Sequence, residues 1–272
     1  MVAARQLAKR LLRESGLLGT VDRLLYISSL ARLRGSNGRF VAANPGFSLP
    51  PKWLAFDAYS APDWAFYKES GLETAAYLAE VSKQYSQSRG PLNVLEWGCG
   101  PGRVIRHIKD AFRQNGRAEV YGSDYNEATI DWCRKNIPGV SFVLNPLLPD
   151  PPLPFNDTFF GFIYSISVFT HLSESASERW MRELGRLAQP GAVLVITTNG
   201  DSWQSKMLPD ELRSYREKGV VTRDKVQEGK KMFSACHSPE YLRQELFRGL
   251  QVLSHLPASF PHTGQDCWIL RK

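Results

Sequence analysis

Residues 94–103 read Val-Leu-Glu-Trp-Gly-Cys-Gly-Pro-Gly-Arg. The apolar start predicts a buried strand, and the glycines predict a tight turn that leads into a helix. Gly98, Gly100 and Gly102 stand at alternate positions, where they remove the side chains that would keep a ligand away from the backbone. We therefore expect a ligand at this turn, with free N–H groups aimed at it.

An acidic residue ends the next predicted strand. The apolar run 118–123 is followed by Asp124, at a spacing that suits hydrogen bonds to the two hydroxyls of a ribose. The turn and this acid together predict a nucleoside-containing cofactor on a Rossmann-like sheet. A tight turn without a ligand is the alternative for the glycines alone, and Asp124 disfavours it.

The spacing of the glycines separates two kinds of cofactor. The nicotinamide fingerprint G-x-G-x-x-G requires a third glycine where this chain has Arg103, which disfavours a dehydrogenase. The pattern Glu96-x-Gly98-x-Gly100-x-Gly102 instead resembles motif I of class I S-adenosylmethionine-dependent methyltransferases. The resemblance implies S-adenosyl-L-methionine as cofactor, with Glu96 near its amino-acid end and the acid after the second strand at its ribose.

Strands and helices are expected to alternate along the rest of the chain. The five expected strands of the first part are 93–97, 119–123, 140–144, 160–168 and 192–197. The expected helices are 67–85, 104–115, 126–136, 173–188 and 238–247. Two more strands, 250–255 and 265–270, end the chain. This order predicts an α/β fold: a Rossmann-like, doubly wound, seven-stranded sheet, mostly parallel, with an antiparallel C-terminal hairpin.

Further segments resemble a bacterial subgroup of the family that is often found with glycan and secondary-metabolite genes. They are 165–172, 180–191 and 264–266, and the resemblance covers roughly residues 60–272. Many relatives have an acid at the end of the third strand; here Asn145 offers an amide oxygen to the adenine amino group. No Asn-Pro-Pro-Tyr or Asp-Pro-Pro-Tyr element follows the fourth strand, which disfavours base nitrogens and glutamine as methyl acceptors.

Most of the net charge of +7 lies in the first 40 residues, where eight basic residues face Glu14 and Asp22. Leucines recur between them at near-helical spacing. We expect residues 1–60 to form a basic amphipathic helical arm with an irregular connector or cap over 41–65. The methyltransferase domain follows over 61–272, with 201–237 as a substrate lid. The arm either packs on its own domain or contacts an anionic membrane or a lipid-linked substrate.

Other features bear on compartment and partners. The four cysteines are scattered without a C-x-x-C pair, which favours a reducing, cytoplasmic location and argues against a metal site. No transmembrane run is present, so membrane contact would be peripheral, at the inner face. No nucleic-acid partner is expected, because the basic residues are not spread around an active-site mouth.

A hydroxyl acceptor benefits from a general base, and histidine is the side chain best suited to that role near neutral pH. His171 follows the fourth strand and His237 borders the lid, so both are candidate catalytic residues; His262 is a weaker candidate. A structural role is the alternative for His171. The remaining candidate cofactor residues are Arg103, Tyr125, Asn145 and Ser165. Residues considered for nearby contacts are Tyr59, Tyr67, Trp132 and Ser167.

The sequence thus predicts an S-adenosylmethionine-dependent methyltransferase that acts on a hydroxyl of a small molecule or glycan. An N-methyltransferase acting on an amino sugar or a protein side chain is one alternative. A catalytically silent module that keeps the cofactor fold is another, and the intact set of glycines and acids argues against it.

Overall fold

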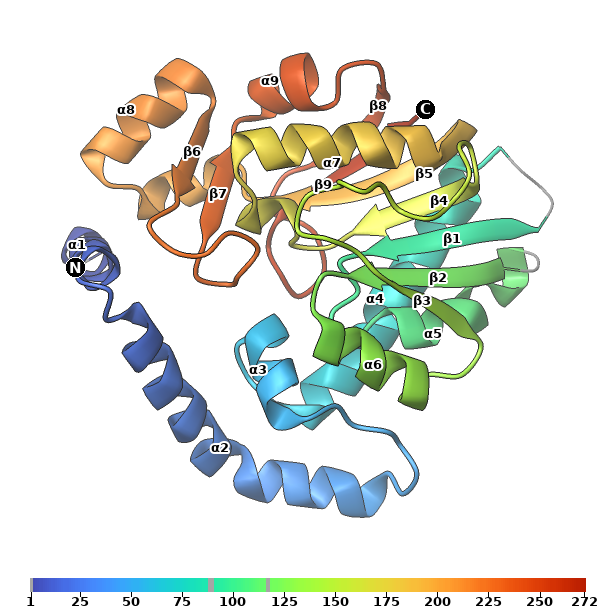
Figure 1. Ribbon diagram of the computed structural model, residues 1–272, viewed down its shortest axis with the longest axis horizontal. Helices are drawn as coiled ribbons and strands as arrows, with labels where there is room; N and C mark the ends of the chain where they lie inside the picture. The colour runs from blue at the N-terminus through green and yellow to red at the C-terminus, as the bar shows by residue number, and fades with distance from the viewer. Residues whose placement is uncertain (1, 88–90, 116–117) are drawn as a thin grey trace.

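The computed structural model describes residues 2–87, 91–115 and 118–272. Its main sheet has seven strands in the order β3-β2-β1-β4-β5-β9-β8 (Figure 1). The strands are β1 (Leu92–Trp97), β2 (Ala118–Asp124), β3 (Val140–Leu144), β4 (Phe160–Ser165), β5 (Ala188–Thr198), β8 (Gln251–Leu256) and β9 (Asp266–Arg271). The first five strands are parallel, whereas β9 runs antiparallel to both β5 and β8. The predicted fold class is confirmed.

Helices cover both faces of the sheet (Figure 1). The helices that pack around it are α4 (Trp64–Tyr85), α5 (Ile105–Ala111), α6 (Glu127–Asn136), α7 (Glu174–Leu187) and α9 (Pro239–Tyr241). Short helical segments extend α5 as η1 (Phe112–Asn115) and α9 as η4 (Leu242–Leu246). Side chains that alternate along each strand divide the core into two clusters, because successive residues of a strand point to opposite faces.

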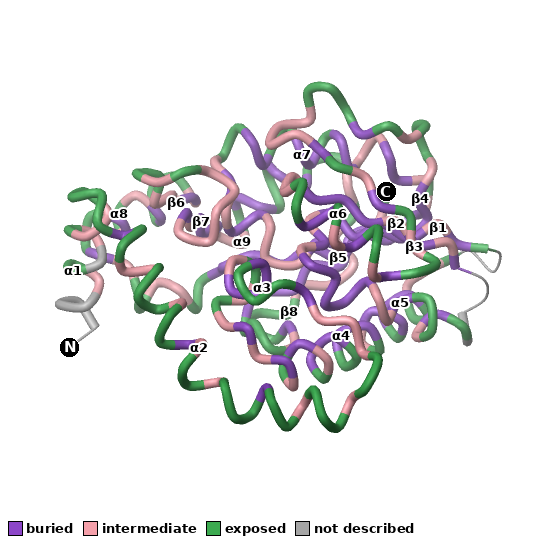
Figure 2. Tube along the Cα trace, turned by 60° about the horizontal axis from the view of Figure 1, so that its bottom comes forward, coloured by how far each residue is buried: buried purple, intermediate pink, exposed green. Residues whose placement is uncertain are grey.

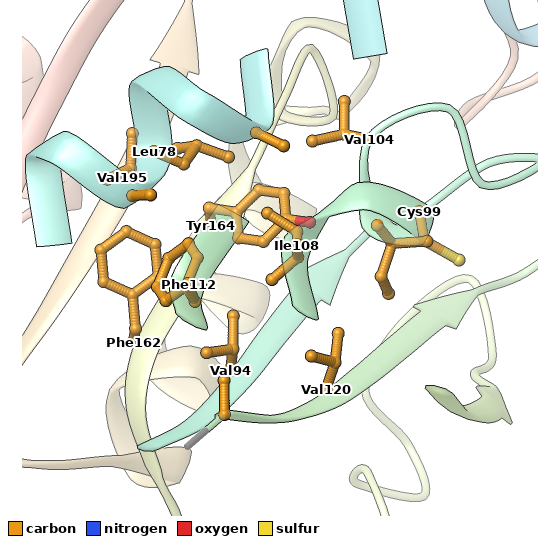
Figure 3. Close-up of a cluster of buried hydrophobic side chains, with 14 of the residues drawn as sticks. Leu78, Val94, Cys99, Val104, Ile108, Phe112, Val120, Phe162, Tyr164 and Val195 are labelled. Carbon is orange, nitrogen blue, oxygen red and sulfur yellow. The ribbon is translucent and has the colours of Figure 1, made fainter. Parts of the chain in front are cut away.

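The division is visible along the central strands. Val94 of β1 and Val195 of β5 lie in the cluster under α4 and α5, part of which Figure 3 shows. Their neighbours Leu95 and Leu194 lie in the cluster under α7 and η4. All four side chains are fully buried, as expected for strands of a parallel sheet covered on both faces.

Two strand boundaries differ from the prediction. β4 ends at Ser165, three residues early, and Ser167 adopts a positive φ of 63° that takes the chain out of the sheet. β5 begins at Ala188 rather than 192, so Pro190 and Gly191 lie within the strand. The register between β4 and β5 shifts at that point, so these residues form a bulge rather than a connection.

The prediction of an irregular connector over 41–65 is wrong in part. α2 (Leu18–Ala43) extends into it, and α3 (Lys52–Tyr59) lies inside it. Pro51 immediately precedes α3, where a fixed φ and a missing N–H favour the start of a helix. Leu54 and Phe56 give the short helix a buried side, so packing decides a segment whose composition suggests a loop.

The segment 201–237, predicted as a lid, has its own secondary structure. Its elements are η3 (Asp201–Lys206), α8 (Pro209–Lys218), β6 (Val220–Arg223) and β7 (Ser234–His237). β6 and β7 form a separate two-stranded antiparallel sheet. Glu211 joins the parts, because its carboxylate pairs with Arg223 at 2.8 Å and accepts a hydrogen bond from the backbone of Leu208.

The N-terminal residues form two helices, α1 (Val2–Glu14) and α2. α2 follows one edge of the molecule (Figure 1) and is exposed over much of its length (Figure 2). Asn37 anchors it: its Nδ2 donates to the carbonyl of Pro62 at 2.7 Å, and its Oδ1 accepts from the N–H of Trp64 at 3.1 Å. No helix in the described part of the chain is both long and apolar enough to cross a bilayer.

Asn37→Ala should detach the arm from the start of α4. The substitution leaves a buried N–H and a buried carbonyl without partners, which costs about 1–3 kcal/mol. We expect a lower free energy of unfolding in urea and faster proteolysis within α2. Ser36→Ala, at the exposed neighbouring position, is the control. Equal protease resistance of the Asn37 variant and the wild type would contradict this anchoring role.

Candidate active site

A cavity of about 1100 Å³, part of it open to solvent, lies where β1, β2 and β4 end. This is the switch point of the strand order, where chains leave the sheet toward opposite faces and ligands commonly bind. The walls combine the glycine turn, the end of β2, the helix α3 and two residues of segment 201–237, Gly229 and Lys231.

The glycine turn requires glycine for conformation and for space. Gly98, Gly100 and Gly102 have φ values of 78°, 51° and 77°. A Cβ at Gly98 would lie 2.2 Å from Val168 Cγ2, and one at Gly102 would lie 2.1 Å from Ile137 Cδ1. Gly98 and Gly100 line the cavity, whereas Gly102 packs behind it. A ligand in the cavity can therefore approach the backbone of the turn closely, because the glycines carry no side chains.

The expectation of free N–H groups at the turn is wrong. The amides of Gly98 and Cys99 donate to the carbonyl of Ser123, and the amide of Gly102 donates to Cys99. The amide of Gly100 donates to Asp124 Oδ2 at 2.9 Å. The turn is thus tied to the end of β2 and presents a close-packed surface rather than an array of donors.

Two predicted residues offer acceptor atoms to the cavity. Asp124 receives the Gly100 amide on Oδ2 and the Asn126 amide on Oδ1, which fixes the carboxylate at the wall. Each oxygen keeps a lone pair for a further donor. Asn145 donates through Nδ2 to Pro146, while its buried Oδ1 has no partner among the described residues. A cofactor with a ribose and an adenine amino group fits these acceptors.

Glu96 and Arg103 are ionisable residues that are buried in the cavity wall. Burial raises the pKa of Glu96 to about 8, against the opposing effects of the Tyr164 hydroxyl, 2.8 Å from Oε2, and the Arg103 charge. Arg103 donates to Ser70 Oγ at 3.0 Å and lies over the ring of Tyr59. Its Nε has no partner in the described residues, so the guanidinium can take an anionic group.

The raised pKa of Glu96 predicts a pH dependence of stability. Between its ordinary pKa of 4.5 and its folded pKa of about 8, the native state holds a proton that the unfolded state has lost. The contribution of Glu96 to the free energy of unfolding therefore falls as pH rises through that window. Glu96→Gln keeps an acceptor for Tyr164 and removes this slope. Urea unfolding of both proteins from about pH 5 to 8 checks it; parallel stability curves would contradict it.

His171 lies in the wall beside the lid, in η2 (Phe169–His171). Its Nδ1 is 2.7 Å from the carbonyl oxygen of Phe233. A carbonyl only accepts, so Nδ1 carries the proton and donates it, which leaves Nε2 of the neutral ring as an acceptor. Burial lowers the pKa of His171 below its ordinary value, so the ring is neutral near pH 7. The Gly229 amide also donates to the His171 carbonyl at 2.9 Å.

Other candidates lie outside the cavity lining. His237 is fully buried in β7, stacks on Tyr241, and has no hydrogen-bond partner for either ring nitrogen among the described residues. Burial lowers the pKa of His237 to about 4. His262 pairs with Glu73. Ser165 is fully buried at the end of β4, beside the cavity-lining Ile166.

Of the remaining candidates, some line the cavity and others are buried behind its wall or in the core. Tyr59 and Tyr125 line the cavity, and the hydroxyl of Tyr125 donates to the carbonyl of Gly229 at 3.2 Å. Tyr67 is buried behind the wall, where its hydroxyl donates to the carbonyl of Pro101. Trp132 packs against the core cluster. Ser167 lines the cavity and donates to Gln265 Oε1 at 2.9 Å.

Sequence reasoning missed two charged wall residues, Asp57 of α3 and Lys231 of the lid. Lys231 pairs with Asp22 of α2 at 2.9 Å. Neither residue belongs to a local motif, and tertiary packing brings both to the turn. For Lys231, the only indication in the sequence is that it falls within the segment 201–237, which was predicted as a lid. Among described residues, no cluster of three or more histidine, cysteine or acidic side chains is arranged to hold a metal ion.

The chain is similar to methyltransferases in sequence. A family model described as a methyltransferase domain matches residues 94–191. Norajmaline N-methyltransferase from Rauvolfia serpentina is 25% identical over 167 residues, which cover 57% of this chain and 51% of that protein. This chain therefore spans about half the length of that curated relative.

Solved structures share the fold. One is the 1,6-didemethyltoxoflavin-N1-methyltransferase of Burkholderia thailandensis with 1,6-didemethyltoxoflavin and S-adenosylhomocysteine. It has a TM-score of 0.51 and 14% identity over 75% of this chain and 79% of that one. Another is a glycopeptide N-methyltransferase in complex with S-adenosyl-L-methionine, with a TM-score of 0.50 and 15% identity. The match covers 76% of this chain and 95% of that one.

The matched segment contains the glycine turn, the acid at the end of β2 and the strands that surround the cavity. The overall fold, which includes the seven-stranded sheet, is similar to that of the Burkholderia thailandensis enzyme. Residues 94–191 thus match a methyltransferase domain, and the fold is that of enzymes whose structures hold S-adenosyl-L-methionine or S-adenosylhomocysteine.

Proposed function

We propose that this chain transfers a methyl group from S-adenosyl-L-methionine to a hydroxyl of a small molecule or glycan. The observation that carries the hydroxyl assignment is His171, a neutral histidine in the cavity wall whose Nδ1–H is committed to Phe233. Its Nε2 is then an acceptor, the state that a general base for a hydroxyl requires.

The residues of the wall suit the parts of the cofactor. Asp124 would accept from the ribose hydroxyls and Asn145 Oδ1 from the adenine amino group. Glu96 would face the amino group of the methionine end, whose positive charge favours the ionised carboxylate. Arg103 would take its carboxylate, since its Nε is unpartnered among the described residues. Tyr125 adds an aromatic face at the same wall.

The chain's own part in the reaction is positioning and proton removal. S-adenosyl-L-methionine supplies a methyl group already activated on its sulfonium. The cavity aligns the acceptor with the methyl group, and this alignment can account for a large share of the rate increase. His171 Nε2 takes the proton of the acceptor hydroxyl, and the Phe233 carbonyl holds the ring and stabilises the charge that forms on it.

Transfer to a nitrogen is the second candidate. Three similar proteins bear names that describe N-methyltransferases: those acting on norajmaline, on 1,6-didemethyltoxoflavin and on a glycopeptide. A neutral amine attacks without a base, so the acceptor would then be an amino sugar, a related small molecule or a protein side chain. In that case His171 would orient the acceptor rather than remove a proton from it.

Labelled methyl transfer to a panel of sugars, phenols and amines tests the proposal. The wild type and His171→Gln are compared on each acceptor that is methylated. Product on oxygen with a large loss of kcat in the variant supports the hydroxyl assignment. Product on nitrogen alone, with kcat preserved in the variant, would replace it with the second candidate. If the protein binds the cofactor but methylates no acceptor on the panel, the result would contradict the proposed acceptor class.

A cytoplasmic location belongs to the same proposal. It is supported by Cys99, Cys133, Cys236 and Cys267, which are buried as free thiols. A reducing compartment keeps thiols in that form. The bacterial subgroup remains a prediction from the sequence segments that resemble it.

A further inference from the structure

We propose that the outward face of α2 docks on an anionic membrane surface. This outward face consists mainly of small and apolar residues spaced three or four apart, all of them exposed: Leu24, Ile27, Ala31, Gly35, Gly38 and Ala42. The exposed Ser28 lies on the same side of the helix. Leu24 and Ile27 expose 62% and 55% of their surface. At about 100° per residue these positions fall on one side of the helix. Figure 2 shows how little of α2 is covered by the rest of the molecule.

Packing on the opposite side fixes which face points outward. Ser29 and Asn37 are buried, and Asn37 binds the start of α4. The ring of Tyr26 lies 5.0 Å from that of Phe56 of α3. α2 therefore already uses one face to attach to its own domain, and the outward face is available for a partner.

Two rows of arginine border the outward face. On the same helical geometry Arg23 and Arg34 lie along one side and Arg32 and Arg39 along the other, and all four are exposed. None of them forms an ion pair with a carboxylate among the residues that the structure describes. The sequence contains no aspartate or glutamate between positions 23 and 56. The charge of this face is thus uncompensated by any carboxylate in the part of the chain that the structure describes.

An apolar strip between two arginine rows matches a lipid surface better than other partners. The strip can enter the boundary between headgroups and acyl chains, while the long arginine side chains reach back to the phosphates. Each basic residue near an anionic leaflet adds attraction. A second copy placed face to face would bring the arginine rows together without any carboxylate between them, which disfavours self-association.

Sedimentation of the full-length protein with vesicles tests the proposal. One set contains phosphatidylglycerol and phosphatidylcholine, and the other contains phosphatidylcholine alone. We expect binding to the first set, with partitioning reduced at least about tenfold in the second and at high salt. Leu24→Glu with Ile27→Glu should lower partitioning by at least about tenfold. Arg32→Glu with Arg39→Glu should do the same by removing the charge attraction.

Leu72→Glu is the matched control, since Leu72 is a helical leucine that is 46% exposed on α4. It should bind vesicles as the wild type does, and every variant should keep its affinity for S-adenosylhomocysteine, which shows that the fold is intact. Docking does not depend on methyl transfer, so its outcome is independent of the acceptor screen.

Several results would overturn the proposal. Equal binding to neutral and anionic vesicles would do so, as would unchanged binding of the Leu24 and Ile27 double variant. A wild-type dimer in analytical ultracentrifugation that the same double variant dissociates would assign the face to a second copy instead. Loss of binding in Leu72→Glu to the same extent would show that the effect is not specific to α2.

Discussion

Gly100→Leu should abolish binding of S-adenosylhomocysteine, lowering affinity by at least about a hundredfold. A Cβ at this position would face the cavity, 3.3 Å from the hydroxyl of Tyr59 and 3.6 Å from Cβ of Ala58. The remaining atoms of a leucine would then occupy the space at the turn that the cofactor requires. Calorimetric titration of the purified variant and wild type measures the change.

Backbone strain needs its own control, because Gly100 has a φ of 51°. Gly249 also has a positive φ, 85°, and a Cβ there meets nothing within 4 Å. Gly249→Leu therefore imposes comparable strain in open space and should leave the affinity unchanged. Wild-type affinity in Gly100→Leu would mean that the cofactor does not use this turn. Equal losses in both variants would attribute the effect to strain.

His171→Gln should lower kcat for a hydroxyl acceptor by about a hundredfold or more while leaving cofactor affinity unchanged. Glutamine can preserve a hydrogen bond to the Phe233 carbonyl, but it cannot accept a proton at the position of Nε2. The change thus removes the basic atom with little disturbance of the wall. Steady-state methyl transfer gives kcat, and titration with S-adenosylhomocysteine gives affinity.

The pH profile separates a basic role from a structural one. Burial holds the pKa of His171 below its ordinary value of 6.5, so the wild type should lose activity only as pH falls through that lower pKa. His171→Gln should lack this acid limb. His262→Gln, the same substitution at a histidine paired with Glu73 away from the cavity lining, should retain both kcat and the profile. An unchanged acid limb in His171→Gln would exclude the histidine as the base.

Much of the central fold was predictable because local patterns and packing agree there. The alternation of buried strands and amphipathic helices fixes the order of elements, and β3 has the bounds that its apolar run predicts. Two predicted helices begin at Asn126 and Ser238, and both side chains accept a backbone hydrogen bond as N-caps there. These features depend on residues close together in the sequence.

Features that depend on distant residues were not predictable in the same way. The amides of Gly98, Cys99 and Gly100 are satisfied by residues 123 and 124, more than twenty positions along the chain. α3 forms because Leu54 and Phe56 find a buried environment, and it then brings Asp57 to the cavity. The partner of His171 Nδ1 is a carbonyl 62 positions away. No local spacing records such pairings, since tertiary packing creates them.

The hydrogen bond from His171 to the carbonyl of Phe233 also selects one tautomer of the imidazole ring. Only with Phe233 in place does every molecule carry its imidazole proton on Nδ1. Withdrawal of that carbonyl would leave the two tautomers to compete, and a fraction of the rings would present a donor where an acceptor is needed. Under the proposed function, the backbone of Phe233 would thus set the fraction of rings that can accept a proton at Nε2.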